Sequence, residues 1–467
     1  MIPLSLTEIA DAVGGRLLSP GVPPYTLVSG SVQTDSRLVE AGSIFFALRG
    51  DETDGHLFAP VAAQNGASVV IAEWPIDLDV PVIVVSDGVT ALADLARFVV
   101  ARVRERGTLS VIGITGSNGK TTTKNMLGAI LGAQAPTVAP VGSFNNHVGA
   151  PISMLRIDEK TRYLVVEMGA SHAGEIAHLV SIAKPDIGVV LKVGLAHVGE
   201  FGGIDAIEKA KAEMVTGLAA SGVAILNIDD PRVAAMAALT PATVRGFGLS
   251  RQADVRGRSV RADLLGTRFT VVAGDHALPI ALRILGEHHV LNALAALAVA
   301  RELGIDLGHA IAALETMHRA ERWRMETLTT PAGATVINDA YNASPDSTEA
   351  ALRTLVQVRA AGSRAIAILG EMTELGDASH THHFEIGRLA TSLGLDLIVV
   401  VGRPARSIYE GAILDESFTG RVEFVESPRE ALDLLVDELR DGDLALVKSS
   451  KSANLRFLGD RLAGVAV

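Results

Sequence analysis

Short apolar runs alternate with helical patterns through the middle of the chain. The runs lie at residues 111–115, 163–167, 186–191 and 223–228. Between them, apolar residues recur at helical spacing, most clearly at 120–131 and 204–220. This alternation predicts a parallel sheet that is covered by helices on both faces. Further along, residues 255–283 lack a helical period and predict antiparallel strands, whereas the alanine- and leucine-rich residues 287–303 predict a helix.

The two flanking regions show related but distinct patterns. The N-terminal region has predicted strands at 44–48 and 68–72 and a predicted helix at 91–104. The C-terminal region repeats the strand and helix alternation, with strands expected at 335–338, 364–369, 396–401 and 443–448. It therefore predicts a second, smaller doubly wound unit of the Rossmann type. Charged segments at 101–107 and 317–326 resemble joints, so we expect three α/β domains: 1–106, 107–320 and 321–467.

Composition narrows the class of protein. The length of 467 residues suits about three domains of roughly 150 residues each. Apolar residues make up 48% of the sequence and charged residues only 20%, and this composition argues against disorder. The formal net charge of −12 argues against nucleic-acid binding through phosphate contacts. The sequence has no cysteine, which excludes disulfides, thiolate catalysis and cysteine-ligated metals. No apolar run approaches the ~20 residues of a membrane span, and the N-terminus is acidic, so a cytoplasmic protein is expected.

A glycine-rich turn carries the clearest chemical signal. It joins the predicted strand at 111–115 to the predicted helix that starts near Lys120. Backbone N–H groups in such a turn, together with a helix N-terminus, bind anions. Lys120 is suited to reach the β- and γ-phosphates of a nucleotide, and the Thr121 hydroxyl is suited to Mg²⁺.

The strict phosphate-loop spacing would put glycine at Ile114, so the motif is a shorter form. An ordinary glycine turn is the alternative, but the strand–turn–helix context favours nucleotide binding. The predicted contacts are Gly116, Ser117, Asn118, Gly119, Lys120, Thr121 and Thr122.

Four further polar positions are candidates with ordinary alternatives. Glu167 ends a predicted parallel strand, where a carboxylate could hold Mg²⁺, although a solvated acid is equally compatible with the local sequence. A lone loop histidine such as His197 is more often structural, because Mg²⁺ prefers oxygen ligands. The simplest interpretation of Lys211 is that it belongs to a solvated face of its predicted helix. The polar segment 338–346 follows a predicted strand and is either a loop or a ligand-contacting edge.

Taken in order, these motifs resemble the Mur ligases, the ATP-dependent amide-forming enzymes of peptidoglycan synthesis. The resemblance rests on the 115–122 loop, Glu167-Met-Gly, Gly194-Leu-Ala-His197, Lys211 and the segment 286–293. Within the family, the segments 34–37, 45–50, 54–58, 143–151, 339–347 and 369–376 are similar to the MurF branch. The chain departs from the family pattern at Lys192 and His289, where asparagine is usual, and at Ser449, where glycine is usual.

The resemblance implies an ATP-dependent ligase that joins D-alanyl-D-alanine to UDP-N-acetylmuramoyl-tripeptide through an acyl phosphate, giving ADP and phosphate. It implies that Glu167 and His197 hold one Mg²⁺ and that carbamylated Lys211 holds a second. Asn292 would contact the adenine, and Arg322 and Asp339 the ribose or the phosphates, with the last domain closing on ATP. The implied substrate-binding residues are Thr34, Asp35, Ser36 and Arg37 for the UDP-sugar, with Asn145, Asn146, Tyr341, Asn342 and Asp346 nearer the reaction.

Two alternatives stay open at the level of sequence. Another Mur-fold ligase, MurE-like or folylpolyglutamate synthetase-like, shares the fold, although the Asp-Asn-Pro-Arg motif expected of MurE is absent from the last domain. A nucleotide switch with a phosphate loop is the alternative from a different class, and it needs no acyl-acceptor domain. A monomer is expected, and the third residue of the peptide substrate is not predicted.

Overall fold

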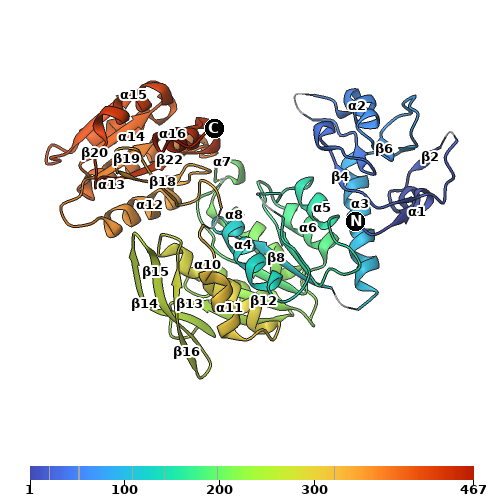
Figure 1. The fold of residues 1–467 in the computed structure, drawn as a ribbon. Helices are drawn as coiled ribbons and strands as arrows, with labels where there is room; N and C mark the ends of the chain where they lie inside the picture. Colours follow the sequence, from blue (N-terminus) through green and yellow to red (C-terminus); the bar gives the residue numbers. More distant parts are fainter. Residues whose placement is uncertain are drawn as a thin grey trace.

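The computed structural model describes residues 1–466 except Pro20, Asp51, Glu52, Thr108, Val141, His197 and Ala320. Three large β-sheets organise the described residues, and each draws its strands from one of the three predicted segments. Figure 1 shows the N-terminal part in blue and the C-terminal part in orange and red on opposite sides of the molecule, with the green and yellow middle part joining them. This arrangement confirms the predicted α/β class with three domains, while the limits at 106 and 320 stay predictions.

The first domain is built around a five-stranded sheet in the order β2-β7-β6-β5-β4. The pairs β4–β5, β5–β6 and β6–β7 are parallel, whereas β2 pairs antiparallel with β7. A small antiparallel pair, β1–β3, lies beside α1. The elements are β1 (Leu4–Ser5), α1 (Leu6–Ala12), β2 (Arg16–Leu18), β3 (Leu27–Val28), β4 (Val32–Gln33), β5 (Ile44–Phe46), α2 (Ala59–Gln64), β6 (Val69–Ala72), β7 (Val82–Val84) and α3 (Gly88–Arg104).

The middle domain has a nine-stranded sheet in the order β16-β15-β14-β13-β12-β11-β8-β10-β9. The strands from β9 to β14 along this order pair in parallel, and β14, β15 and β16 form the predicted antiparallel extension. The strands are β8 (Ser110–Thr115), β9 (Thr137–Val138), β10 (Tyr163–Glu167), β11 (Ile187–Val190), β12 (Val223–Asn227), β13 (Thr243–Gly248), β14 (Val255–Asp263), β15 (Gly266–Ala273) and β16 (His276–Leu282). The helices are α4 (Lys120–Gly132), α5 (Gly149–Met154), α6 (Glu175–Ala183), α7 (Val198–Phe201), α8 (Ile204–Thr216), α9 (Pro231–Ala235), α10 (His288–Glu302) and α11 (Leu307–Glu315).

The last domain has a six-stranded sheet in the order β17-β18-β22-β19-β20-β21, in which β17 alone pairs antiparallel. Its strands are β17 (Glu326–Thr329), β18 (Thr335–Asp339), β19 (Ala365–Leu369), β20 (Leu397–Val401), β21 (Arg421–Val425) and β22 (Leu444–Lys448). Its helices are α12 (Pro345–Val358), α13 (Ser379–Ser392), α14 (Arg406–Ile413), α15 (Pro428–Glu438) and α16 (Leu455–Leu462).

Alternate residues of the central strands enter different cores, which explains the continuous apolar runs. In β19, Ala365, Ala367 and Leu369 pack with α12, α13 and α14, while Ile366 and Ile368 pack with α15 and α16. The same division in the middle domain places Ile112 with α4 and α10, and Val111 with α6 and α8. Burial on both faces therefore removes the polar alternation that a half-exposed strand would show.

Helix α3 connects the first domain to the second through packing as well as through the chain. It contacts α1 in its own domain and both α5 and α6 in the middle domain, within one continuous apolar core. The segment after α3 is thus a short connection between two packed bodies. None of the helices among the described residues is long and apolar enough to cross a membrane.

Candidate active site

The glycine-rich turn has the geometry that its sequence predicts. It leaves β8 after Thr115, and Gly116 and Gly119 adopt φ values of +147° and +87° before α4 begins at Lys120. Ser117 anchors the turn to the segment after β11. Its Oγ donates to the Gly194 carbonyl at 3.1 Å and accepts from the Gly194 N–H at 2.9 Å, and its own N–H donates to the Lys192 carbonyl at 2.8 Å. Three hydrogen bonds to one segment therefore fix the turn directly before the N-terminus of α4.

Within the turn, Gly119 tolerates a side chain less well than Gly116 does. Its φ is left-handed, and a Cβ would lie 2.3 Å from the Asn292 Oδ1. We expect Gly119→Ala to weaken ATP binding about tenfold, because strain of about 1–3 kcal/mol at the turn must be relieved by moving the phosphate contacts. Calorimetric titration with ATP checks this. Gly132→Ala, at the open end of the same helix, meets no atom within 4 Å and should bind like the wild type; equal affinity of the two variants would contradict the prediction.

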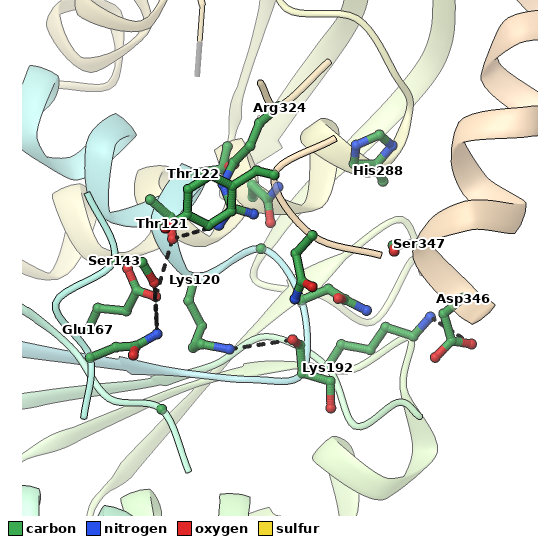
Figure 2. A pocket seen from close by; sticks show the side chains of 18 of the residues that line it. Lys120, Thr121, Thr122, Ser143, Glu167, Lys192, His288, Arg324, Asp346 and Ser347 are labelled. Atoms are coloured by element: carbon green, nitrogen blue, oxygen red, sulfur yellow. Dashed lines mark hydrogen bonds and ion pairs between the residues drawn. The ribbon is translucent and has the colours of Figure 1, made fainter. Parts of the chain in front are cut away.

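Lys120 lies against the turn that it follows. Its Nζ donates to the Gly116 carbonyl at 2.7 Å and lies 3.4 Å from the Ser117 carbonyl. Burial lowers the pKa of the Lys120 ammonium, and the Glu167 carboxylate opposes this effect. Figure 2 shows Lys120, Glu167, Arg324 and Asp346 around one cleft. The ammonium is thus placed beside the glycine-rich turn, and backbone carbonyls are its hydrogen-bond acceptors.

Glu167 is a buried carboxylate whose two oxygens have different surroundings. It is 3% exposed at the end of β10. Its Oε1 accepts hydrogen bonds from Thr121 Oγ1 at 3.2 Å, Ser143 Oγ at 3.1 Å and Asn145 Nδ2 at 2.8 Å. Its Oε2 is buried and has no hydrogen-bond partner among the described residues. An orphaned, buried carboxylate oxygen beside a phosphate-binding turn fits Mg²⁺, which prefers oxygen ligands.

Lys211 lies inside the protein, contrary to the ordinary interpretation of its helical pattern. The residue is 2% exposed on α8, and its Nζ lies 5.8 Å from the centre of the Phe201 ring. Burial, followed by the charge of Lys120, lowers the pKa of Lys211 to about 7, against a raising effect of Glu175 and Glu213. A substantial part of this amine is therefore uncharged at neutral pH, unlike that of a surface lysine.

A cleft of about 480 Å³ extends from the glycine-rich turn to the last domain. The middle domain supplies most of the predicted phosphate contacts, together with Glu167, Lys192, His288, His289 and Asn292. The last domain supplies polar and charged side chains from the ends of β18 and β22, from the start of α12 and from the segment before β17. They are Arg324, Asp339, Tyr341, Asn342, Asp346, Ser347 and Lys448. The cleft therefore lies outside the carboxyl ends of the strands of both sheets, where ligands bind in such folds.

Two of the predicted residues of the last domain, Asp339 and Asn342, share the partner Lys448 at this edge. The Asp339 Oδ2 lies 2.6 Å from the Lys448 Nζ, and the buried Lys448 also donates to the Asn342 carbonyl at 2.8 Å. Asp346 reaches across to the middle domain. Its Oδ2 accepts from the Leu195 N–H at 2.9 Å, and its Oδ1 lies 3.9 Å from the Lys192 Nζ. Asp346 and Lys192 thus connect the two walls of the cleft.

Asn292 and two histidines form the wall beside the turn. Asn292 Oδ1 lies 3.4 Å from the Thr123 Oγ1, and its Nδ2 lies 3.2 Å from the His289 Nδ1. Burial lowers the pKa of His288 to about 4 and moves the pKa of His289 well below its usual range. Both imidazoles are therefore neutral at physiological pH and add no positive charge to the cleft.

Arg322 and Arg324 take different directions although they are two residues apart. The Arg322 guanidinium donates to the Asp460 Oδ2 at 3.0 Å and lies over the Trp323 ring, outside the cleft. The Arg324 guanidinium lies 4.4 Å from the centre of the Tyr341 ring and donates to the Thr121 Oγ1 at 3.3 Å. The structure thus brings Arg324, which the sequence did not single out, to the place expected of Arg322.

These two arginines provide a matched test. We expect Arg324→Ala to raise the KM for ATP about tenfold or more, because a charge-assisted hydrogen bond contributes about 1.5–3 kcal/mol. Arg322→Ala should lower the melting temperature, because its partner Asp460 is 1% exposed and loses its cation. The same variant should leave the KM for ATP within about twofold, because Arg322 lies outside the cleft. Steady-state kinetics and thermal unfolding of both variants check the assignment. A larger KM effect from Arg322→Ala would contradict it.

The predicted UDP-sugar residues lie in the first domain, away from this cleft. They follow β4 at the carboxyl edge of the first sheet, where Asp35 caps a short 3₁₀ turn and its Oδ2 lies 2.6 Å from the exposed Arg37 guanidinium. Ser36 is buried, and its carbonyl accepts from the Asn65 side chain at 2.9 Å. Thr34 precedes this turn and is half-buried. The four residues therefore form a separate cluster that does not line the cleft.

His197 lies outside the described residues, so its predicted metal contact has no structural account. Within the described part of the chain, no group of three or more histidine, aspartate or glutamate side chains is arranged to hold a metal ion.

The sequence did not indicate that Ser143 donates a hydrogen bond to Glu167, or that Lys124 and Lys448 are buried cations. Lys124 is 2% exposed and lies 3.9 Å from Glu167 Oε2. A lysine in the second turn of a helix gave no signal that it would be buried.

Three family models match the chain in the order of its domains. They are the Mur ligase family catalytic domain at residues 30–100, the Mur ligase middle domain at 114–300, and the Mur ligase glutamate ligase domain at 323–451. Together they cover most of the sequence, and the second contains the phosphate-binding turn, Glu167 and Lys211.

Curated relatives and solved structures match over nearly the full length. The UDP-N-acetylmuramoyl-tripeptide–D-alanyl-D-alanine ligase of Mycobacterium tuberculosis (strain CDC 1551 / Oshkosh) is 41% identical, with 99% of this chain and 98% of the relative covered. The crystal structure of MurF from Acinetobacter baumannii has a TM-score of 0.88 at 32% identity, with 99% of both chains covered. MurF ligase from Thermotoga maritima in complex with ADP has a TM-score of 0.79 at 28% identity, covering 93% of this chain and 98% of that one. As its motifs predict, the chain belongs to the Mur ligase family, in the MurF branch.

Proposed function

We propose that the chain is an ATP-dependent ligase that joins D-alanyl-D-alanine to the terminal carboxylate of UDP-N-acetylmuramoyl-tripeptide, giving ADP and phosphate. The observation that carries this proposal is the cleft in which a phosphate-binding turn faces a polar edge of a second doubly wound domain. A nucleotide switch needs only the first of these walls. The names of the full-length relatives support the choice of this ligase among Mur-fold enzymes.

The chemistry begins with the repulsion between two anions. The peptide carboxylate attacks the γ-phosphorus of ATP, and Lys120 supplies positive charge where the transferred phosphoryl group develops charge. We propose that Glu167, Thr121 and His197 hold Mg²⁺, with the free Oε2 of Glu167 supporting this role. When bound, Mg²⁺ would neutralise phosphate charge and orient the oxygens for in-line transfer. Arg324 contacts the same Thr121 hydroxyl and adds a cation from the last domain.

We propose that Lys211 acts as a carbamate and holds a second Mg²⁺. A carbamate forms when an uncharged amine attacks CO₂ and the nitrogen then releases a proton, and the anionic product offers two oxygen atoms as metal ligands. The burial of Lys211, its lowered pKa and the nearby positive charge of Lys120 support this assignment. A buried, uncharged amine costs less to carbamylate than a solvated ammonium, which must first lose its proton.

The last domain would place the second substrate and complete the reaction. The free amine of the dipeptide attacks the carbonyl carbon of the acyl phosphate, and the tetrahedral intermediate releases phosphate. Tyr341, Asn342 and Asp346 lie at the cleft edge and are proposed to orient the dipeptide, with Asn145 and Asn146 on the opposite side. Asp339 is proposed to contact the ribose or the phosphates, and Asn292 the adenine. The cluster from Thr34 to Arg37 would hold the UDP end of the long substrate.

Exclusion of water is a separate requirement, because water would destroy the acyl phosphate. The two walls of the cleft touch through Asp346 and Leu195, and α7 touches the last domain where the Gly199 N–H donates to the Glu374 carbonyl at 3.0 Å. Substrates must nevertheless enter, so we propose that the last domain opens and closes near residues 317–326. We expect small-angle scattering to give a smaller radius of gyration with a non-hydrolysable ATP analogue plus UDP-substrate than without ligand. An unchanged radius at saturating ligand would contradict the hinge.

Amine selectivity tests the proposed reaction against its alternatives. We expect phosphate release from ATP with UDP-N-acetylmuramoyl-tripeptide to require D-alanyl-D-alanine, with D-glutamate and diamino acids giving little turnover. A MurE-like enzyme would instead use a diamino acid, and a nucleotide switch would release phosphate at the same rate with or without the amine. The third residue of the tripeptide can be varied in the same assay.

We also expect the protein to be a monomer and to be located in the cytoplasm.

A further inference from the structure

Lys124 is a buried cation for which the reaction described above has no role. It lies on α4 one turn after Lys120, is 2% exposed, and does not line the cleft. Its charged surroundings are Glu167 and Glu321 on the negative side and Arg324 and Arg156 on the positive side. A lysine is almost never fully buried unless it is paired, so its position calls for a specific partner.

Two contacts connect Lys124 to Glu167. The first is direct, because the Lys124 Nζ lies 3.9 Å from the Oε2 of Glu167, the oxygen without a hydrogen-bond partner. At this distance the lysine supplies charge to the carboxylate without occupying the oxygen. The second is indirect, because the Lys124 Nζ also donates to the Gly142 carbonyl.

Gly142 begins the segment that supplies the other partners of Glu167. Ser143 and Asn145 follow directly and provide two of the three hydrogen bonds to its Oε1. The Gly142 N–H donates to the Glu321 carboxylate, so both backbone polar groups of Gly142 have partners. Lys124 therefore influences both oxygens of Glu167: Oε2 through charge and Oε1 through the placement of its donors.

We propose that Lys124 is a positioning residue that orients the Glu167 carboxylate and leaves its Oε2 available to the metal ion. The inference rests on the proposed role of Glu167 as a metal ligand. Groups that orient a metal ligand in this way typically change metal affinity or activity by about 10–100-fold when they are removed. A lysine that served only the packing of α4 would not change metal affinity selectively.

The test measures Mn²⁺ binding by the loss of the free-ion electron paramagnetic resonance signal, at fixed ADP and with a nucleotide-only blank. We expect Lys124→Met to raise the Kd for Mn²⁺ about 10–100-fold. Met126→Leu, a buried substitution on the same helix, should leave the Kd within about twofold. Glu167→Gln should weaken binding at least as much as Lys124→Met, and the double variant should bind no more weakly than Glu167→Gln alone.

The outcomes separate this inference from the assignment on which it depends. If Glu167→Gln weakens Mn²⁺ binding and Lys124→Met does not, Lys124 has no positioning role. If neither variant weakens binding, the metal role of Glu167 fails and the inference fails with it. Should Lys124→Met not fold, thermal unfolding of Lys124→Met/Glu167→Gln decides, since removing both charges should restore folding if Glu167 is the partner. A double variant that also fails to fold would overturn the inference.

Discussion

Replacing Lys120 with alanine is expected to lower the ligation rate by about 10²–10³-fold without unfolding the protein. The ammonium is the cation placed against the turn, 2.7 Å from the Gly116 carbonyl, and it meets the phosphoryl group as charge develops. Loss of one such preorganised electrostatic contact costs about this factor in other enzymes. Single-turnover phosphate release measures the chemical step directly.

A matched variant separates this effect from a general loss of charge. Lys160→Ala removes an exposed lysine from a turn of the same domain and should leave the rate unchanged within about twofold. Thermal unfolding of both variants shows whether the fold is retained. A folded Lys120→Ala protein with near-normal turnover would remove the phosphate-binding assignment of the turn.

Lys211→Ala is expected to be inactive, and acetate or another short carboxylate is expected to restore part of the activity. The alanine leaves a space at a site that is 2% exposed, and a small carboxylate can supply the oxygen ligands of the missing carbamate. Lys209→Ala serves as the control, because Lys209 is exposed on the same helix and its loss should matter little. Activity is measured with and without added carboxylate at constant ionic strength.

The result distinguishes a metal-holding carbamate from a buried structural lysine. A structural lysine would lower stability in the alanine variant, and acetate would not raise its turnover. Full activity of Lys211→Ala without any additive would contradict the carbamate proposal outright.

Much of the fold could be predicted because its central strands are buried on both faces. The strand expected at 163–167 is β10, and those expected at 364–369 and 443–448 differ from β19 and β22 by one residue at the start. Two of the strands that were not predicted, β21 and β13, carry polar or glycine residues and are less buried. Strand β21 lies at the edge of its sheet without a fully buried residue, and β13 contains Arg245 and Gly246. Apolar runs therefore identify the centre of each sheet better than its edges.

The geometry of the glycine-rich turn could be predicted because its sequence signals are local. One strand end, two glycines and one helix start specify it within a few residues. The identity of the arginine in the cleft could not be predicted in this way. Trp323 and Met325 adopt positive φ values of +60° and +52°, and these unusual conformations accompany the opposite directions of Arg322 and Arg324. Sequence spacing alone carries no sign of such a backbone change.

Burial of the two unexpected lysines depends on contacts that are distant in sequence. Lys124 is enclosed because the segment after Val141 folds over α4, and Lys448 because Asp339 lies opposite it on the neighbouring strand. Helical spacing and strand alternation describe only the element itself. A charged residue that is buried by another segment therefore escapes pattern analysis, although it belongs to the most informative part of the site.

Oxygen transfer from the peptide carboxylate tests the central claim most directly. The protein is supplied with ATP, D-alanyl-D-alanine and UDP-N-acetylmuramoyl-tripeptide whose terminal carboxylate carries ¹⁸O, and mass spectrometry follows both products. An acyl phosphate predicts that each joined peptide is matched by one phosphate carrying one ¹⁸O atom from the carboxylate. Phosphate without ¹⁸O, or ATP hydrolysis without a joined peptide, would contradict the account.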